Sequence, residues 1–341
     1  MSSASTLEWD SGGATDASDA DSSLGSDARS TETRSVSSSV YQYRWEQGRR
    51  YHAFDDGTYF LPNDDPEQDR LDLQHHLFRL TVDGALYLAP VPETVKNVLD
   101  IGTGTGIWAI EFADQHPDAQ VLGVDLSAIQ PQFVPPNCSF RVDDAERDWV
   151  ESEKYDFIHA RALIGGIKNW PRLFQQAYEH LTPGGILELQ DPCLPVRPLD
   201  PADADKSDAV TWGKHFLQAT KYAGVNVQAP LTWVEQLQAA GFVDIHVKWY
   251  NWPCGPWPKG KKNKMLGEWA LEDFIAGSKS TITLFTRILG WSAEEYQILL
   301  AKVHSEYKEQ KTHLYLPVCF LWARKPGGPQ TSGESAGEHA V

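Results

Sequence analysis

The sequence has few cysteines, no long apolar run and a shortage of positive charge. Its four cysteines stand far apart, without a CxxC pair or a matching histidine cluster, which argues against a disulfide framework or a structural zinc site. We therefore expect reduced thiols and no bound metal. No stretch approaches the roughly 20 apolar residues that span a bilayer, and no basic start precedes an apolar run as in a signal peptide. These absences predict a soluble intracellular protein without a membrane partner, cytoplasmic or alternatively nuclear.

The chain of 341 residues is acidic throughout. It carries 47 Asp and Glu against 30 Lys and Arg side chains, for a formal net charge of −17. Residues 1–40 contribute seven carboxylates and two arginines (−7 + 2 = −5), so about −12 belongs to the remainder. Such a surface repels a phosphate backbone, and no nucleic-acid partner is expected.

The two ends differ in composition from the rest. Residues 1–40 are mainly Ser, Asp, Ala, Gly and Thr, too polar to offset the entropy lost on ordering, and are predicted to be a disordered tail. A phosphorylation or partner-docking segment is the alternative interpretation. Residues 326–341 are rich in Gly and Pro and are predicted to be a flexible C-terminus.

Residues 41–90 form a separate predicted unit, an N-terminal cap segment. Its clearest element is a helix that starts with Asp65 as its cap, followed by proline at the first helical position. Because residues at i, i+4 and i+7 share one helix face, His75 is expected to lie on the face that packs. That stripe consists of Leu71, His75 and Phe78.

From residue 91 the sequence alternates between short β-rich runs and helix-length segments. This alternation predicts an α/β domain over 91–325, with a mostly parallel sheet and helices on both faces. A helical insert at about 251–312, before the last strand, is interpreted as a cover over a site. The expected strands are Val95–Ile101, Ala119–Leu126, Cys138–Val142, Lys154–Ala160, Gly184–Gln190, Phe242–Tyr250 and His313–Lys325.

A glycine-rich loop follows the first of these strands. Residues 100–106 read D-I-G-T-G-T-G between a strand and a helix, where missing Cβ atoms let a ligand approach the backbone and the helix N-terminus offers amide donors. The spacing is GxGxG after an acid, not the GxGxxG of dinucleotide-binding proteins, which favours S-adenosylmethionine over NAD. The candidate cofactor-binding residues are Asp100, Gly102, Thr103, Gly104 and Gly106.

Acidic residues follow the next two strands. Asp125 closes the second strand beside Leu126, where its carboxylate can accept both ribose hydroxyls of an adenosine-containing ligand. Asp143, Asp144 and Ala145 follow the third strand, placed to accept from an adenine amino group. The simpler interpretation is that these acids cap the turns after their strands.

Together these motifs resemble the class I S-adenosylmethionine-dependent methyltransferases. The likeness rests on DxGxGxG at 100–106, the acid at Asp125, the D-A-E element at Asp144 and LTPGG at 181–185. Over residues 44–325 the chain also resembles the fungal methyltransferases related to the velvet-complex regulator of secondary metabolism. The segments that carry this narrower likeness are 48–78, 102–131 and 156–163. The resemblance implies a Rossmann-like seven-stranded sheet, bound S-adenosylmethionine, and an N-terminal segment packed near the cofactor mouth.

Methyl transfer needs a nucleophile in line with the sulfonium carbon, and positioning supplies much of the rate, so a base is optional. His159 and Arg161 stand at the end of the fourth strand and are the candidate catalytic residues, with His159 as proton acceptor. The alternative is that His159 serves packing or orientation. Ala160 and Arg161 are also assigned to the cofactor site.

The methyl acceptor is interpreted as an oxygen or nitrogen of a small molecule in secondary metabolism. The aromatic stretch at 249–264 is a candidate lining for its pocket, although Trp252 and Trp257, beside prolines, are equally well explained as loop anchors. One alternative is a regulator that acts through protein partners, as the resemblance and the Ser- and Asp-rich tail suggest. Another is an NAD-dependent oxidoreductase, because Asp125 suits either ribose.

Overall fold

The computed structural model describes residues 43–52, 59–150 and 152–327. The predictions for residues 1–40 and for the chain beyond 327 lie outside this part. The strands are β1 (Arg44–Glu46), β2 (Arg49–Tyr51), β3 (Asn97–Ile101), β4 (Gln120–Asp125), β5 (Cys138–Val142), β6 (Tyr155–Arg161), β7 (Leu181–Pro192), β8 (Arg197–Pro198), β9 (Val243–Pro253) and β10 (Leu314–Arg324). The α-helices are α1 (Asp65–Thr81), α2 (Ile107–Gln115), α3 (Trp170–His180), α4 (Asp208–Tyr222), α5 (Trp233–Ala239), α6 (Lys261–Ser280) and α7 (Ala293–Glu309). The short helices are η2 (Pro201–Lys206), η3 (Ala229–Leu231) and the π-helical turn η4 (Leu284–Ile288).

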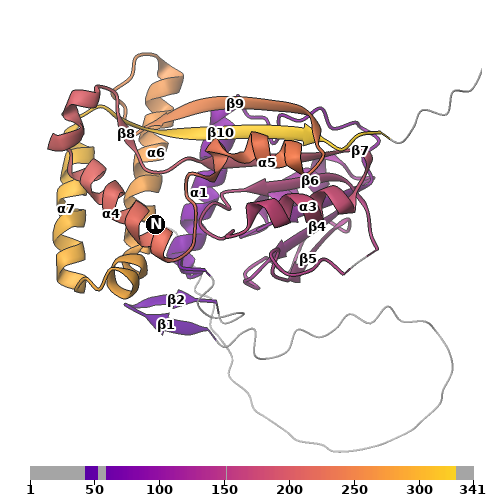
Figure 1. The fold of residues 1–341 in the computed structure, drawn as a ribbon, viewed down its shortest axis with the longest axis horizontal. Helices are drawn as coiled ribbons and strands as arrows, with labels where there is room; N and C mark the ends of the chain where they lie inside the picture. Colours follow the sequence, from indigo (N-terminus) through magenta and orange to yellow (C-terminus); the bar gives the residue numbers. More distant parts are fainter. Residues whose placement is uncertain (1–42, 53–58, 151, 328–341) are drawn as a thin grey trace, which may run out of the picture. The chain divides into compact units, whose positions relative to one another are not determined.

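A mostly parallel sheet forms the centre of the described part (Figure 1). Its strand order is β5-β4-β3-β6-β7-β10-β8, and β9 pairs with β10. The first five strands of this order are parallel, whereas β10 runs antiparallel to β7, β8 and β9. The predicted Rossmann-like fold class is confirmed. The described sheet has eight strands instead of seven because the two-residue β8 adds a short pairing to the start of β10.

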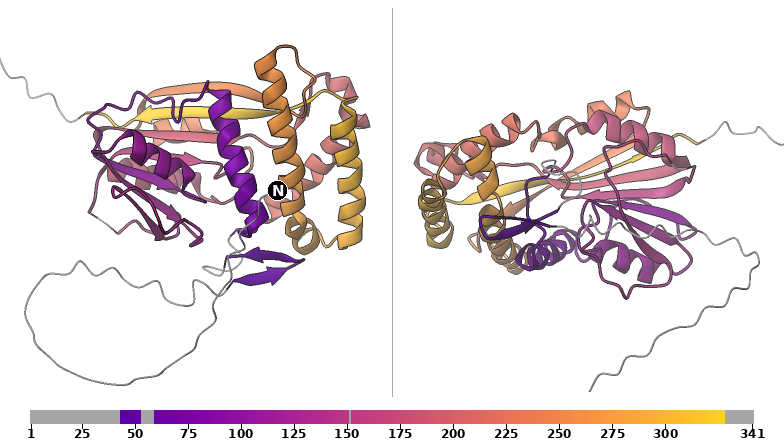
Figure 2. Two further views of the ribbon diagram at one scale, coloured as in Figure 1. Left: turned by 180° about the vertical axis from the view of Figure 1, so that it is seen from behind. Right: turned by 90° about the horizontal axis from the view of Figure 1, so that it is seen from below.

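Alternating side chains divide each central strand between two hydrophobic cores. In β3, Leu99 and Ile101 belong to the core that also contains residues of α3 and α5, whereas Val98 packs with Trp108 of α2. Figure 2 shows α2 on one face of the sheet and α3 and α5 on the other. Because successive strand residues point to opposite faces, both faces of a buried parallel strand must be apolar.

Strand β7 begins earlier than predicted. The predicted strand starts at Gly184, after the Thr-Pro-Gly-Gly segment, but β7 already starts at Leu181, directly after α3. The register of β7 against β6 shifts here, from Tyr155 opposite Leu181 to Phe157 opposite Ile186. The segment is therefore a bulge within the strand.

Helix α1 begins one residue earlier than predicted, and Asp64 is its cap instead of Asp65. The Asp64 carboxylate accepts the N–H of Glu67 at 3.2 Å. It also accepts two hydrogen bonds from the guanidinium of Arg49 in β2, at 2.5 and 2.8 Å, whereas the Asp65 side chain is exposed. Asp64 and Asp65 are both residue types that favour the N-cap position. Asp64 is the one that contacts Arg49. His75 is fully buried, as its place in the apolar stripe predicts.

The insert between β9 and β10 packs against the N-terminal segment. Figure 2 shows α1 and α6 lying side by side, with α7 on the other side of α6. An ion pair joins α1 and α6, because Arg70 Nη1 lies 2.7 Å from Asp273 Oδ1. Helices α1 and α6, about 200 residues apart in the sequence, thus pack against each other.

Membrane-spanning helices and metal sites can be assessed only within the described residues. Within them, no helix is long and apolar enough to cross a membrane. The same part of the chain holds no group of three or more His, Cys, Asp or Glu side chains arranged to bind a metal. All four cysteines are buried and free.

Candidate active site

Two adjoining cavities lie at the carboxyl ends of the parallel strands, where open α/β folds bind ligands. The first, which we call the loop cavity, has a volume of about 120 Å³ and is lined by the glycine loop and by the ends of β4, β5 and β6. The second, the apolar cavity, has a volume of about 160 Å³ and is lined by residues of α1, α4 and α6 and by the segments after β6 and β7. The residues that line both cavities are Tyr59, Glu67, Leu71 and Ala162.

The glycine loop turns through left-handed backbone conformations. The φ angles of Gly102, Gly104 and Gly106 are 63°, 58° and 84°, a region that glycine adopts without the strain that a Cβ imposes. At Gly106 an added Cβ would also overlap the ring of Phe140. Gly106 is the residue directly before α2, so these glycines bring the chain from β3 into the helix.

Asp100 fastens the loop to the neighbouring strand. Its Oδ2 accepts the hydroxyl of Thr103 at 2.6 Å, and its Oδ1 accepts Nδ1 of His159 at 2.7 Å. His159 is fully buried and stacks on Trp108, with ring centroids 3.7 Å apart and planes 4° apart. Burial lowers the pKa of His159, although the Asp100 carboxylate opposes this shift. His159 does not line the apolar cavity, so the geometry favours orientation of the loop over proton transfer.

Asp125 ends β4 with its carboxylate in the wall of the loop cavity. Its Oδ2 accepts the N–H of Gly104 at 2.8 Å, and its Oδ1 accepts the N–H of Ser127 at 2.9 Å. Burial raises the pKa of Asp125 to about 6, against the effect of these two hydrogen bonds, and the charge of Asp100 raises it further. Asp125 therefore connects two strand ends and remains ionised at neutral pH.

Asp143 and Asp144 follow β5 and line the same cavity. Asp144 Oδ1 accepts the N–H of Glu146 at 2.9 Å, and Asp143 Oδ1 accepts the N–H of Asp144 at 2.8 Å. Asp125 lies opposite Val142 in the parallel pairing of β4 with β5, which brings both acidic turns to one edge. The acids cap their turns and face the cavity, so the two interpretations of the sequence are compatible.

Arg161 is a half-buried cation at the end of β6. Its Nη2 donates to His75 Nδ1 at 2.9 Å, and its guanidinium lies 5.1 Å from the ring centroid of Phe78. Because a guanidinium only donates, the proton of His75 is on Nε2, which lies 3.2 Å from Glu111 Oε2. Burial lowers the pKa of Arg161 to about 10 and that of His75 to about 2, so at pH 7 the first is charged and the second neutral. No carboxylate of the described residues pairs directly with Arg161.

Of the other predicted cofactor-binding residues, some line the loop cavity and others lie behind its wall. Leu126 and Ala145 line the loop cavity. Ala160 is fully buried within β6, and Thr103 lies behind the loop, next to His159.

Sequence patterns alone did not identify the N-terminal contribution to the loop cavity. The side chain of Asn63 donates to Ser127 Oγ at 3.2 Å and so ties this segment to the turn after β4. The only signal for it was the family resemblance over residues 48–78, which implied a segment near the cofactor mouth. The N-terminal residues that line the loop cavity are Tyr59, Pro62, Asn63, Glu67 and Leu71.

Large side chains form most of the apolar cavity's wall. Trp252 lines it and is held by a 2.7 Å hydrogen bond from its Nε1 to Thr81 Oγ1. Trp257 instead donates to the carbonyl of Leu314 at 3.1 Å and stacks on His313, as a loop anchor does. The aromatic members of the wall are Tyr59, Phe60, Trp212, Phe216, Trp252, Phe274 and Tyr307.

Comparison with known proteins decides between a methyltransferase and a dehydrogenase. A family model described as a methyltransferase domain matches residues 73–247. The chain belongs to this methyltransferase family. Methyltransferase pytC of Aspergillus terreus is 41% identical over 294 residues, covering 86% of this chain and 91% of that protein. The probable methyltransferase tdiE of Emericella nidulans is 36% identical, covering 78% and 84%. The protein-methionine methyltransferase laeA of Emericella nidulans is 36% identical, covering 84% and 77%.

The cofactor of this methyltransferase is S-adenosylmethionine, and the loop cavity has the side chains that such a ligand requires. An adenosine offers donors, namely two ribose hydroxyls and an amino group, and the carboxylates of Asp125 and Asp144 are acceptors in the same wall. The methionine part carries a carboxylate, and the half-buried Arg161 lines this cavity as well. The donor and acceptor chemistry therefore fits the cofactor.

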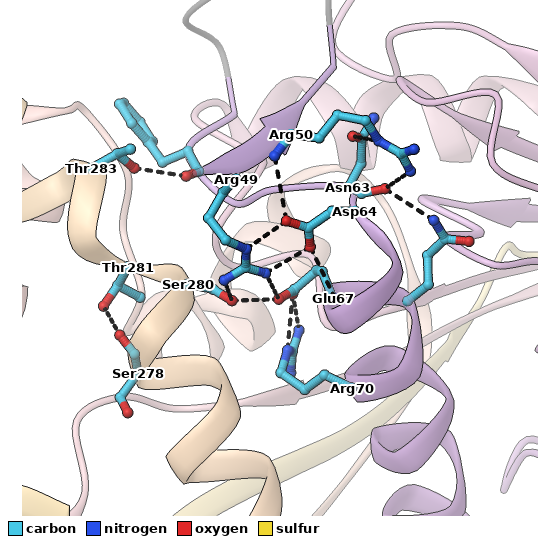
Figure 3. Close-up of polar contacts among 12 residues, drawn as sticks. Arg49, Arg50, Asn63, Asp64, Glu67, Arg70, Ser278, Ser280, Thr281 and Thr283 are labelled. Carbon is cyan, nitrogen blue, oxygen red and sulfur yellow. Dashed lines mark hydrogen bonds and ion pairs between the residues drawn. The ribbon is translucent and has the colours of Figure 1, made fainter. Parts of the chain in front are cut away.

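A network of charged side chains lies beside the apolar cavity and connects the N-terminal segment with the insert (Figure 3). Glu67 accepts two hydrogen bonds from Arg70, at 2.9 and 2.7 Å, and one from the hydroxyl of Ser280 at 2.5 Å. Arg49 of β2 lies 3.8 Å from Glu67 and pairs with Asp64. The network joins β2, α1 and the end of α6, so the N-terminal segment and the insert are held together.

We expect Gly106→Ala to destabilise the protein more than Gly84→Ala. Both glycines have left-handed φ angles, 84° and 90°, where a Cβ costs about 1–2 kcal/mol. Only at Gly106 would the Cβ also overlap Phe140, which adds about 1–3 kcal/mol of overpacking. Urea unfolding followed by circular dichroism measures both free energies of unfolding. Equal losses in the two variants would contradict the close packing of the loop against Phe140.

Proposed function

We propose that this methyltransferase transfers a methyl group to an oxygen or nitrogen of a small, largely apolar molecule of secondary metabolism, bound in the apolar cavity. The observation that supports this proposal is the position of the apolar cavity. It shares lining residues with the loop cavity and is lined mainly by aromatic and aliphatic side chains. The cap segment 41–90 and the insert at about 251–312 both contribute to it, as expected for an enclosure that keeps water from an acceptor.

Within the cofactor site, we assign the adenosine to the ends of β4 and β5. Asp125 accepts the ribose hydroxyls, Asp144 accepts from the adenine amino group with Asp143 as its support, and Leu126 and Ala145 flank the base. These roles rest on the position of each residue in the cavity wall and on the acceptor chemistry of the carboxylates.

The methionine part is assigned to the glycine loop and Arg161. Gly102 and Gly104 line the loop cavity and let the ligand approach the backbone closely. Asp100 and Thr103 hold the loop from behind. A half-buried guanidinium without a paired carboxylate fits the carboxylate of the ligand, since hydrogen bonds between two charged groups are the stronger ones.

Catalysis in this proposal is positioning. S-adenosylmethionine, when bound, supplies an electrophilic methyl group on a positively charged sulfur. The chain holds the acceptor against the shared wall and excludes water, and neither His159 nor Arg161 lines the apolar cavity. We therefore assign His159 to orienting the loop through Asp100 and Arg161 to the cofactor.

A protein acceptor, and action through protein partners, is the second candidate function. The observation that favours it is the 36% identity to the protein-methionine methyltransferase laeA. It predicts label in protein instead of in small molecules, stable complexes with other proteins, and a nuclear fraction in the cell. Affinity capture with and without residues 1–40, combined with cell fractionation, separates it from a cytoplasmic enzyme of small-molecule metabolism.

Binding of S-adenosylhomocysteine should weaken in mild acid. Because the pKa of Asp125 is raised to about 6, its carboxylate is the ribose acceptor at pH 7 and becomes protonated below pH 6. Affinity measured by calorimetry should be constant from pH 7 to 8 and then fall by up to about tenfold per pH unit below the pKa. Asp125→Asn should bind about 1–3 kcal/mol more weakly at pH 7 and lose this pH dependence. A parallel fall in the variant would assign the titration to another group.

Arg161→Met should distinguish the two ends of the cofactor. Loss of the guanidinium should reduce the affinity for S-adenosylhomocysteine by about 1.5–3 kcal/mol, because a charged hydrogen bond to the carboxylate is lost. The affinity for 5′-methylthioadenosine, which lacks that carboxylate, should change less than about twofold. Equal losses for both ligands would indicate that Arg161 supports the fold and not the carboxylate.

Filling the apolar cavity should stop methyl transfer without affecting cofactor binding. Gly277 of α6 lines the apolar cavity, and a Cβ added there would lie 3.7 Å from Arg70 Cδ, an ordinary contact, so we choose Gly277→Leu to reduce the volume of the cavity. With labelled S-adenosylmethionine and fungal metabolite extracts, labelled small molecules should fall by about tenfold or more. Glu272→Leu, on the exposed side of α6, is the matched control. Unchanged transfer in Gly277→Leu, or label only in protein, would refute the assignment of the acceptor site.

A further inference from the structure

Four side chains form the boundary between the loop cavity and the apolar cavity, and they differ in what they can contribute. Leu71 and Ala162 are apolar. The carboxylate of Glu67 is already engaged by Arg70 and by the hydroxyl of Ser280. Tyr59 is therefore the member of the described boundary that has a polar group available for a ligand.

The phenol of Tyr59 faces the cavities without a hydrogen-bond partner among the described residues. Burial raises the pKa of Tyr59 well above its ordinary value, so its hydroxyl stays neutral at every physiological pH. The Tyr59 side chain as a whole is half-buried and lines both cavities, so its hydroxyl is open to a ligand bound there. A ligand that supplies a donor or an acceptor at this point gains a hydrogen bond without displacing a protein partner.

The surrounding structure holds Tyr59 in place. Its ring packs against the turn after β6, where Cβ atoms added at Gly165 and Gly166 would lie 3.9 and 3.6 Å from it. The next residue, Phe60, accepts the hydroxyl of Thr283 at 2.9 Å, and Asn63 donates to Ser127 at 3.2 Å. Figure 3 shows Thr283 and Asn63 on the two sides of the network that joins the insert to α1.

We propose that the Tyr59 hydroxyl contacts the ligands at the point of methyl transfer, with its oxygen directed at the transferable methyl group and at the O–H or N–H of the acceptor. This inference rests on the proposed function, because it assigns the acceptor to the apolar cavity. Tyr59 is then a catalytic residue that orients the nucleophile as a neutral hydrogen-bonding group. The proton that the acceptor loses on methylation would pass to solvent, with S-adenosylhomocysteine as the other product, and Tyr59 neither removes that proton nor forms a covalent bond.

Sinefungin tests this placement without knowledge of the acceptor. This analogue of the cofactor carries an amino group where S-adenosylmethionine carries the methyl group, whereas S-adenosylhomocysteine carries nothing there. Calorimetry on the full-length protein and on Tyr59→Phe compares the two ligands. We expect Tyr59→Phe to bind sinefungin about tenfold more weakly, because a hydrogen bond to a charged amine is lost, and S-adenosylhomocysteine within about twofold of the unmodified protein.

Tyr87→Phe is the matched control, since the Tyr87 hydroxyl bonds to His116 Nε2 at 3.0 Å and lines neither cavity. It should change neither affinity. Equal affinities of Tyr59→Phe and the unmodified protein for sinefungin, or equal losses for both ligands, would overturn the inference. A crystal structure of the unmodified protein with sinefungin gives an independent decision, because the Tyr59 oxygen should lie within hydrogen-bonding distance of the amine and any longer separation refutes the proposal. Neither measurement involves an acceptor, so an error in the acceptor assignment would appear separately, in the labelling experiment with Gly277→Leu.

Discussion

The buried carboxylate of Asp100 is the interaction on which the cofactor site depends. One oxygen holds Thr103 within the glycine loop, and the other holds His159 in the neighbouring strand. His159 in turn stacks on Trp108 of α2, so one carboxylate links β3, β6 and the helix that follows the loop. Because a buried charge without partners is very costly, both partners must be in place for this arrangement to be stable. The shape of the loop follows from that requirement.

A second group of buried charges fixes the arrangement of the helices around the apolar cavity. Arg70 lies between Glu67 on its own helix and Asp273 on α6, at 2.7 Å from each. Such an arrangement adds little net stability, because desolvation offsets the attraction, but it disfavours other alignments of the two helices. The same helices line the apolar cavity, so the alignment of α1 with α6 determines its shape.

The two halves of the site therefore have different structural origins. The loop cavity is built mainly by the sheet and its loops, inside the region that matches the methyltransferase family, residues 73–247. The apolar cavity depends on the N-terminal segment and on the insert, which lie largely outside that region. The loop cavity therefore lies mainly within the matched region, whereas the apolar cavity also needs residues on both sides of it.

The sequence by itself determined the fold class and the glycine loop with its acidic neighbours, because hydrophobic period, turn residues and motif spacing are local properties. It also placed His75 in the core. The prediction of Asp65 as the cap of α1 was wrong, because Asp64 fits the same local rule and its contact with Arg49 is a tertiary one. The sequence offered no reason to single out Tyr59 or Glu67, and it left His159 open between proton transfer and packing. Those assignments depend on contacts between residues up to about 200 positions apart, such as Arg70 with Asp273, and only the tertiary structure brings these residues together.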